Sequence, residues 1–292
     1  MKSDWKIILP QYSYELNAEN SILSISPCAW TNGSLNCILN DQEYSQLLER
    51  ALNEIKNGSI SKIVLSRIIP SRHKRVDEAV VTLFQKKFPS SCTFYIPHSE
   101  DELWFGATPE LLLEGRDGKW KTRSIAGTRM IDSNRPWGVK ERFEQMLVTE
   151  GITEGLEAAK AKNILLGNQY TFRSGSIEHI CSDIQFEFDG EIEKIIHLIH
   201  PTAAVLGKPK DASQNWLAEN EPHHREWYTG TFQVEHKNTI HVYVFLRCGK
   251  ANATGIQWYV GGGLTAESNV QDELQETINK ANSLEQVLSS QP

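Results

Sequence analysis

The sequence predicts an α+β protein, because its expected strands come in groups and do not alternate one by one with helices. One group precedes a long helix that begins near residue 139, and further groups follow it. Such grouping is typical of antiparallel sheets covered by helices, whereas regular alternation indicates a parallel, doubly wound sheet. The 292 residues contain neither an internal repeat nor a linker-like stretch. We therefore expect a single domain.

The first half of the chain is expected to contain two helices and most of the short strands. Residues 1–40 hold only two β-like runs, at 6–9 and 21–25. A helix begins at Asp41 and ends at Asn57-Gly58, because apolar residues recur at helical spacing between them. Residues 61–67 read as a strand that ends by Pro70. A helix at 77–87 and strands at 92–96, 102–105 and 111–114 complete this half.

The second half opens with the long helix, expected over residues 139–161. Strands are predicted at 176–181, 184–188, 239–248 and 255–260, with a short helical run at 191–200. The last helix spans about 271–288.

Composition excludes several classes of protein. The chain has 30 basic and 37 acidic residues, a net charge of −7, which argues against broad binding to nucleic acid or to an anionic membrane. An anionic small molecule remains compatible, since a local site can be basic. Five scattered cysteines suggest neither a disulfide framework nor a zinc site. Without a signal-like start or a long apolar run, we expect a cytoplasmic protein.

Two helices each carry a pair of carboxylates on one face. Glu273, Glu276 and Lys280 share a face of the last helix, and Glu141 and Glu144 share a face of the long helix. The alternative for each is a solvated surface. Four such carboxylates could supply the oxygen ligands that Mg²⁺ prefers. The glycines at 261–263, expected as a turn before the last helix, could let backbone amides approach an anion.

Lys62 and Glu110 are candidates for acid–base chemistry. Lys62 interrupts an apolar strand, where burial would lower its pKa as a general base requires. The alternative is an edge-strand lysine that prevents aggregation. Glu110 lies between a turn signal and Leu111. Its carboxyl group either has a raised pKa and acts as an acid, or caps the turn.

The order of ten short motifs along the chain resembles one family. The motifs are KIVLSR at 62–67, GATPELL at 106–112, SIAGTR at 124–129, KERFE at 140–144, HICS at 179–182, HPTAAV at 200–205, REWYTG at 225–230, FLR at 245–247, GGGL at 261–264 and ELQETINK at 273–280. Together they resemble the chorismate-utilising enzymes, which include isochorismate, salicylate, anthranilate and aminodeoxychorismate synthases. The resemblance covers residues 41–288.

This resemblance implies two antiparallel sheets packed face to face, with helices outside and a chorismate site between them. It implies Mg²⁺ held by Glu144 and Glu273, with Glu141 and Glu276 supporting through water. The metal would bind the ring carboxylate of chorismate. The remaining substrate contacts implied by the family are Gly127, Thr128, His179, Ala204, Tyr228, Arg247, Gly262 and Lys280. Tyr228, Arg247 and the amides near Gly262 would hold the enolpyruvyl carboxylate.

The resemblance is greatest to the isochorismate synthases. Ammonia-adding members typically have Gln where this chain has Lys62, whereas water-adding members have Lys, which can deprotonate water. Glu110 would then protonate the departing C4 hydroxyl. Salicylate synthases, which also eliminate pyruvate, have Thr at the position of Ala204. A salicylate synthase and a non-catalytic chorismate-binding protein are the alternatives.

The family also shapes three further expectations. Residues 1–40 would be a short β segment of the same domain, and residues 41–288 the catalytic domain. The segment before Lys62 is shorter than the family norm, so the fold is expected to be N-terminally shortened. We expect a monomer. Menaquinone, siderophore and salicylate metabolism all remain possible destinations of the product.

Overall fold

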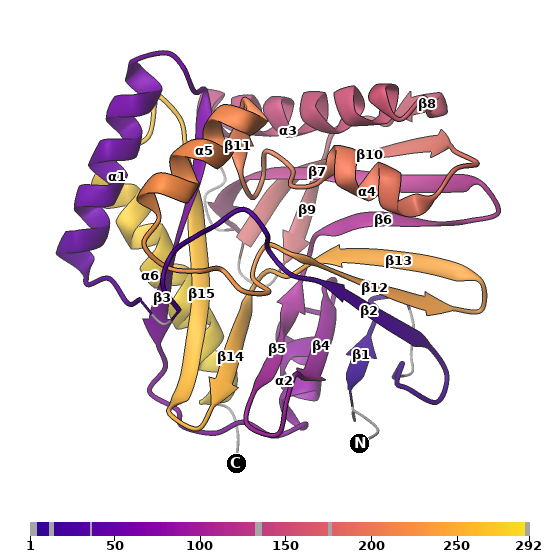
Figure 1. Ribbon diagram of the computed structural model, residues 1–292, viewed down its shortest axis with the longest axis horizontal. Helices are drawn as coiled ribbons and strands as arrows, with labels where there is room; N and C mark the ends of the chain where they lie inside the picture. Colours follow the sequence, from indigo (N-terminus) through magenta and orange to yellow (C-terminus); the bar gives the residue numbers. More distant parts are fainter. Residues whose placement is uncertain (1–4, 12–14, 36, 132–135, 175–176, 290–292) are drawn as a thin grey trace.

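Two antiparallel sheets and six helices make up the computed structural model, which describes residues 5–11, 15–35, 37–131, 136–174 and 177–289 (Figure 1). The seven-stranded sheet has the order β1 (Lys6–Ile8), β4 (Cys92–Pro97), β5 (Leu103–Thr108), β14 (Cys248–Asn252), β15 (Gly255–Leu264), β3 (Lys62–Pro70) and β11 (Gly207–Lys208).

The eight-stranded sheet has the order β2 (Ile22–Ser26), β12 (Thr231–His236), β13 (Thr239–Val244), β6 (Leu111–Arg116), β7 (Lys119–Met130), β10 (Ile177–Glu187) and β8 (Lys162–Leu166). Its remaining strand, β9 (Tyr170–Ser174), pairs with another part of β10. The helices are α1 (Asp41–Lys56), α2 (Val80–Lys87), α3 (Val139–Ala158), α4 (Ile192–Ile199), α5 (Lys210–Asn220) and α6 (Val270–Leu288). The predicted α+β class is confirmed.

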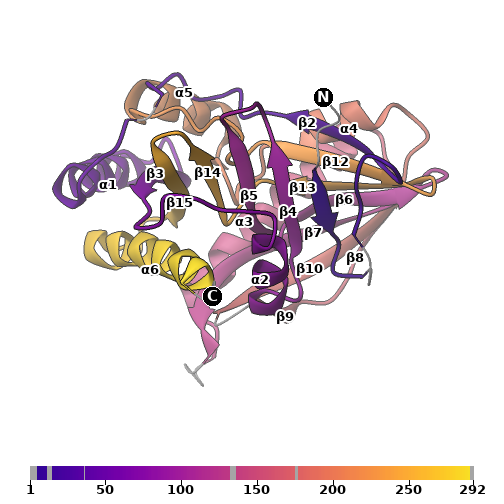
Figure 2. The ribbon, with the colours of Figure 1, turned by 90° about the horizontal axis from the view of Figure 1, so that it is seen from below.

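The two sheets pack face to face through an aromatic core. Phe94 and Tyr259 of the seven-stranded sheet lie in one buried cluster with Phe232 and Tyr243 of the eight-stranded sheet. Apolar residues of α3 and α4 cover the other face of the eight-stranded sheet, and those of α2 and α6 cover the seven-stranded one. In Figure 2, α6 runs beside β15 and α1 lies at the same end of the molecule. The implied arrangement of sheets inside and helices outside is confirmed.

Helix α1 begins where the sequence predicts. The Asn40 side chain accepts a hydrogen bond from the Glu43 amide at 3.0 Å, and the Glu43 carboxylate accepts one from the Asn40 amide at 2.8 Å. This reciprocal capping box satisfies two amides that the first helical turn leaves unpaired. The apolar face of the helix then packs against Ile63 and Leu65 of β3. Strand β3 is thereby held from outside the sheet.

A buried ion pair also holds the backbone of β3. The Arg225 guanidinium contacts both oxygens of Glu221, at 2.6 and 2.8 Å, and both side chains are fully buried. Arg225 also donates to the carbonyls of Val64, at 2.7 Å, and Val205, at 2.8 Å. Glu221 accepts from the Ser66 amide at 2.9 Å. The pair therefore fixes β3 to the loop that precedes β11.

Replacing Arg225 by Met is expected to lower the free energy of unfolding by about 3–5 kcal/mol, because it leaves the buried Glu221 carboxylate without its counter-charge. Urea denaturation followed by circular dichroism measures the loss. The double variant Glu221→Gln/Arg225→Met removes both charges and should recover part of it. An unchanged urea midpoint in Arg225→Met would contradict this account of the pair.

The chain passes from one sheet to the other at Pro109-Glu110. Strand β5 ends at Thr108 in the seven-stranded sheet and β6 begins at Leu111 in the eight-stranded sheet. The Glu110 carbonyl accepts from the Val244 amide at 3.1 Å, which ties this link to β13. Glu110 is therefore placed at the junction of the two sheets.

Several element boundaries differ from the sequence prediction. The strands predicted at 176–181 and 184–188 are one strand, β10, which ends at Glu187, and the predicted strand at 239–248 is two strands, β13 and β14. Helix α2 begins three residues later than predicted, and α3 ends three residues earlier. The predicted start of a strand at residue 176 lies outside the described residues. Strands β7, β8, β9, β11 and β12 and helix α5 were not predicted.

The segment before α1 contributes a strand to each sheet. β1 pairs with β4, and β2 pairs with β12. The division of the chain at residue 40 stays a prediction. In the described part of the chain, every helix is too short or too polar to cross a membrane.

Candidate active site

Lysine and glutamate side chains from the seven-stranded sheet, from the link between the sheets and from two helices come close together. Lys62 comes from β3, Glu110 from the β5–β6 link, Glu144 from α3, and Glu273 and Glu276 from α6. Lys62 and Glu110 are close enough that each shifts the pKa of the other. Charged groups are rarely buried unless paired or functional. This cluster is the candidate active site.

Lys62 is buried in the sheet and is not an edge residue. Its side chain is 2% exposed, and its ammonium lies 4.0 Å from Glu144. Burial lowers the pKa of Lys62, although Glu144 and Glu110 oppose the shift. The protective edge-strand alternative is therefore wrong, since β15 and β11 pair with both edges of β3. A buried lysine that releases its proton easily suits a general base.

Unlike an ordinary surface carboxylate, Glu110 is buried and holds its proton more tightly. It is 4% exposed, and burial raises its pKa to about 7, against the lowering effects of Thr202 and Lys62. The Thr202 hydroxyl donates to Glu110 Oε1 at 3.3 Å. A carboxyl group that keeps its proton near neutral pH can serve as a general acid.

The three glycines at 261–263 lie inside β15, so the predicted glycine turn is wrong. Strand β15 continues to Leu264, and α6 begins only at Val270. Because these glycines have no side chains, other residues can pack closely against this part of β15. A Cβ on Gly261 would lie 3.1 Å from the Tyr228 hydroxyl, and one on Gly262 would lie 3.2 Å from Glu273 Oε2. The glycines let site residues reach the strand surface.

Gly263→Ala should fold but lose turnover by about 10²-fold, because the new Cβ would lie 2.8 Å from Lys62 Cε and displace the ammonium. Circular dichroism and steady-state kinetics on the same preparation test this. Gly261→Ala is the contrasting variant, since its Cβ would meet the Leu65 carbonyl at 2.5 Å and should destabilise the sheet itself. Full activity in Gly263→Ala would contradict the assigned position of Lys62.

A carboxylate cluster lies beside Lys62. Glu273 is 1% exposed and accepts from the Lys140 ammonium at 2.6 Å, and Lys140 also lies 3.7 Å from Glu144. Burial raises the pKa of Glu144. Glu276 pairs with Lys280 at 2.7 Å, and this pair lowers the pKa of Glu276 although burial opposes the shift.

Glu141 is placed apart from these three carboxylates. Its backbone packs against Gly127, and its carboxylate lies near Gly138 at the start of α3. The described contacts of Glu141 include none with Glu144, Glu273 or Glu276.

A second group of predicted residues surrounds His179. The Arg247 guanidinium donates to His179 Nε2 at 2.9 Å, so the ring proton is on Nδ1, where Thr128 Oγ1 lies 3.1 Å away. Burial, with Arg247 beside it, lowers the pKa of His179 to about 3, so the ring is neutral. Burial also lowers the pKa of Arg247 to about 10. Arg247 remains a cation at neutral pH.

Gly127 creates a bulge that brings this group to α3. Thr128 pairs with His179 and Ala126 with Ile180, so Gly127 is an extra residue in β7. Its φ of +68° is easily adopted only by glycine. The bend places β7 against Glu141 of α3.

The remaining predicted residues connect the two groups. Lys280 donates to the Gly261 carbonyl at 2.6 Å and is close enough to lower the pKa of His179. Tyr228 is buried, and burial raises its pKa. The Ala204 amide donates to Thr202 Oγ1 at 3.2 Å, and Thr202 reaches Glu110. All predicted positions except the Glu141 carboxylate are thus linked by contacts or by mutual electrostatic effects.

The sequence does not single out Lys140, and it gives Thr202 only as one of the polar candidates in the loop at 200–202. Lys140 and Thr202 lie inside the KERFE and HPTAAV motifs, and proximity to Glu144 and His200 was the available signal. Their roles become visible only through contacts across the fold, Lys140 with α6 and Thr202 with the β5–β6 link.

The donor chemistry of the carboxylate cluster fits a hard divalent cation. In the described part of the chain, no three His, Cys, Asp or Glu side chains converge closely enough to hold a metal ion as they stand. However, Glu273 Oε2 is buried and has no hydrogen-bond partner among the described residues. Such an atom is costly unless something pairs with it. Carboxylate oxygens are also the ligands that Mg²⁺ prefers.

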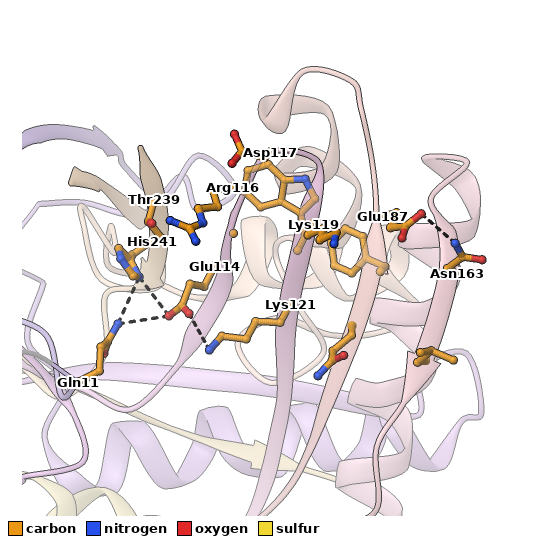
Figure 3. Close-up of a pocket in the computed structure, with 15 residues that line it drawn as sticks. Gln11, Glu114, Arg116, Asp117, Lys119, Lys121, Asn163, Glu187, Thr239 and His241 are labelled. Carbon is orange, nitrogen blue, oxygen red and sulfur yellow. Dashed lines mark hydrogen bonds and ion pairs between the residues drawn. The ribbon is translucent and has the colours of Figure 1, made fainter. Parts of the chain in front are cut away.

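A separate hollow of about 860 Å³ opens beside β6, β7, β10 and β13 of the eight-stranded sheet, on the face away from α3 and α4 (Figure 3). Around Glu114, Gln11 donates at 3.3 Å, Lys121 pairs at 2.6 Å and His241 lies at 3.1 Å. The hollow is lined by none of the predicted site residues.

Comparison with known proteins identifies the family. The model of the family described as chorismate binding enzyme matches residues 9–286. The isochorismate synthase MenF of Escherichia coli (strain K12) is 29% identical over 258 residues, which are 84% of this chain and 60% of the relative. Anthranilate synthase component 1 of Aquifex aeolicus (strain VF5) is 23% identical over 258 residues, 83% of this chain and 52% of the relative.

Among solved structures, the menaquinone-specific isochorismate synthase MenF of Escherichia coli matches with a TM-score of 0.78 at 25% identity, over 91% of this chain and 64% of that one. The chain spans about 60% of the length of the first curated relatives that it matches. The family match, the shared fold and the order of the motifs agree: this chain belongs to the chorismate-binding enzymes.

Proposed function

We propose that this protein is an isochorismate synthase that adds water at ring C2 of chorismate with loss of the C4 hydroxyl. One observation carries the proposal: a buried lysine with a lowered pKa lies near a buried glutamate whose pKa is about 7. This is the base and acid pair that water addition with loss of a hydroxyl requires. The isochorismate synthases among the relatives support the same reaction.

In the proposed mechanism, Lys62 takes a proton from the attacking water as its oxygen bonds to C2. Glu110 gives its proton to the C4 oxygen, which leaves as water while the ring double bond shifts. The two proton transfers balance, so the net reaction is an isomerisation. Thr202 orients the Glu110 carboxyl group through its hydrogen bond.

Substrate binding is proposed to use the group around His179. Arg247 is a cation that can hold a carboxylate through two parallel hydrogen bonds. Tyr228 and the β15 backbone near Gly262 would assist it, and Gly127, Thr128 and Ala204 would line the ring. The neutral His179 fixes the Arg247 guanidinium at 2.9 Å, and Lys280 adds a further positive charge. The enolpyruvyl carboxylate is the proposed partner of Arg247.

Mg²⁺ is the proposed cofactor, held by Glu144 and Glu273 with support from Glu276. When bound, it would neutralise the ring carboxylate of chorismate. Support for Glu144 and Glu273 comes from their burial beside Lys62 and from the unpaired Glu273 Oε2. A role for Glu141 through water stays a prediction. A cytoplasmic location and a monomeric state are proposed with the same activity.

The test is incubation with chorismate and Mg²⁺, followed by chromatographic analysis of the products. Isochorismate as the sole product is expected, and EDTA should abolish its formation until Mg²⁺ is restored. Salicylate with pyruvate would identify a salicylate synthase. Binding of chorismate by a folded sample without any product would identify a non-catalytic binder, and either outcome overturns the proposal.

A further inference from the structure

Lys140 lies between the two glutamates proposed as the main metal ligands. Its ammonium is 2.6 Å from Glu273 Oε1 and 3.7 Å from Glu144 Oε1. These two pairings raise the pKa of Lys140, although burial opposes the shift. A single positive charge thus bridges a carboxylate of α3 and a carboxylate of α6.

The location of Lys140 in its own helix is unfavourable for a cation. It is the second residue of α3, in the first turn, where the helix dipole is positive. The two glutamates offset this cost, so Lys140 is held by the site and not by its helix. Its side chain is 28% exposed, which leaves it a path to solvent.

The other two lysines of the cluster cannot take the same role. Lys62 is 2% exposed and lies on a strand paired on both sides, by β15 and β11. Lys280 is bound to Glu276 and to the Gly261 carbonyl, at 2.7 and 2.6 Å. Among the described contacts, Lys140 is the one that joins Glu144 to Glu273. It is therefore the cation that a divalent ion at these glutamates would have to displace.

We propose that Lys140 is a built-in competitor of the metal, a resident counter-ion that leaves Glu144 and Glu273 when a divalent cation binds. The proposal rests on the proposed function, because that function assigns Mg²⁺ to these glutamates. Lys140 then sets the Mg²⁺ affinity of the site. A positive charge within a few ångströms of a divalent cation in a partly buried site weakens its binding strongly.

Direct Mg²⁺ binding without chorismate tests this. Isothermal titration calorimetry should give Lys140→Met an affinity for Mg²⁺ at least about tenfold higher than wild type, because the competing charge is gone. Lys140→Arg, which keeps the charge, should stay close to wild type. The melting temperature of Lys140→Met should be lower than wild type without Mg²⁺ and rise further when Mg²⁺ is added, because its glutamates have lost their counter-ion.

Lys121→Met is the matched control. Lys121 pairs with Glu114 at the same distance of 2.6 Å, but in the separate hollow lined by none of the site residues. Its loss should leave Mg²⁺ affinity unchanged. If Lys140→Met does not fold, Lys140→Gln removes the charge and keeps a donor for Glu273.

Equal or weaker Mg²⁺ binding in the folded neutral variant overturns the proposal, as does failure of both proteins to bind Mg²⁺. The two proposals fail separately. If Lys140→Met binds Mg²⁺ more tightly but the wild-type protein forms no isochorismate, the role of Lys140 stands and the proposed synthase activity is overturned. If the wild-type protein forms isochorismate but Lys140→Met has unchanged Mg²⁺ affinity, the synthase proposal stands and the role of Lys140 is overturned.

Discussion

Lys62→Met is expected to reduce turnover of chorismate by about 10²–10⁴-fold while leaving the protein at least as stable as wild type. The activity falls because no other group takes the proton from the attacking water. Stability is kept because a side chain that is 2% exposed no longer carries a charge that burial disfavours. Steady-state kinetics and urea denaturation measure the two effects.

Two further variants make the Lys62 prediction specific. Lys62→Arg keeps a positive charge but cannot act as a base, so it should be as inactive as Lys62→Met. Lys208→Met is the matched control, because Lys208 pairs directly with Lys62 across β3 and β11, yet its ammonium contacts the more exposed Glu150 and Glu154. Lys208→Met should keep full activity. Substantial activity in Lys62→Arg would rule out a base at this position.

Glu110→Gln should have opposite effects on activity and on stability. Turnover should fall by about 10²–10⁴-fold, because the amide has no proton to give to the leaving oxygen. Burial raises the pKa of Glu110 from 4.5 to about 7, so the folded protein holds the proton more tightly than the unfolded chain. The wild-type free energy of unfolding therefore falls as pH rises from about 4.5 to 7, and Gln does not titrate.

The free energy of unfolding of Glu110→Gln, relative to that of wild type, should therefore rise by about 3 kcal/mol between pH 4 and pH 8. This follows from about 1.4 kcal/mol per unit of pKa shift. Urea denaturation at both pH values measures it. Glu114→Gln, in strand β6 that directly follows Glu110, is the matched control. There, burial opposes ionisation, but His241 and Lys121 lower the pKa to about 2. Glu114→Gln should lose stability at neutral pH and keep activity, and equal pH dependence in both variants would contradict the assignment.

The helix residues Glu144, Glu273, Glu276 and Lys280 could be predicted as site candidates because helical periodicity and the family resemblance both point to them. Spacing alone places Glu273, Glu276 and Lys280 on one face of α6. It does not reveal that Glu273 is paired with Lys140 of another helix. That contact depends on how α3 and α6 approach each other across the sheets, which no local pattern encodes. The Glu141 carboxylate lies apart from the other three for the same reason: its position depends on how α3 packs in the fold, and helical spacing does not reveal this.

The strands and the helix that the sequence does not predict have weak local sequence signals. Strand β7 carries Lys119, Lys121 and Arg123 on alternate positions and has a glycine bulge at Gly127, so its apolar signal is weak. Helix α5 buries only Ser213 and Leu217, too few for a visible apolar stripe. The glycines of β15 wrongly predict a turn because glycine usually weakens strands. Here the space they leave is filled by side chains of the site.

The position of β3 has a consequence for how the protein is made. Its apolar residues lie between β15 and β11, and both of these neighbours come from the last third of the chain. During translation, β3 therefore leaves the ribosome long before either partner exists. Until the C-terminal strands are synthesised, this segment is an unpaired, aggregation-prone edge. Lys62, the proposed general base at the start of β3, is thus positioned late, when the C-terminal strands close the sheet around it.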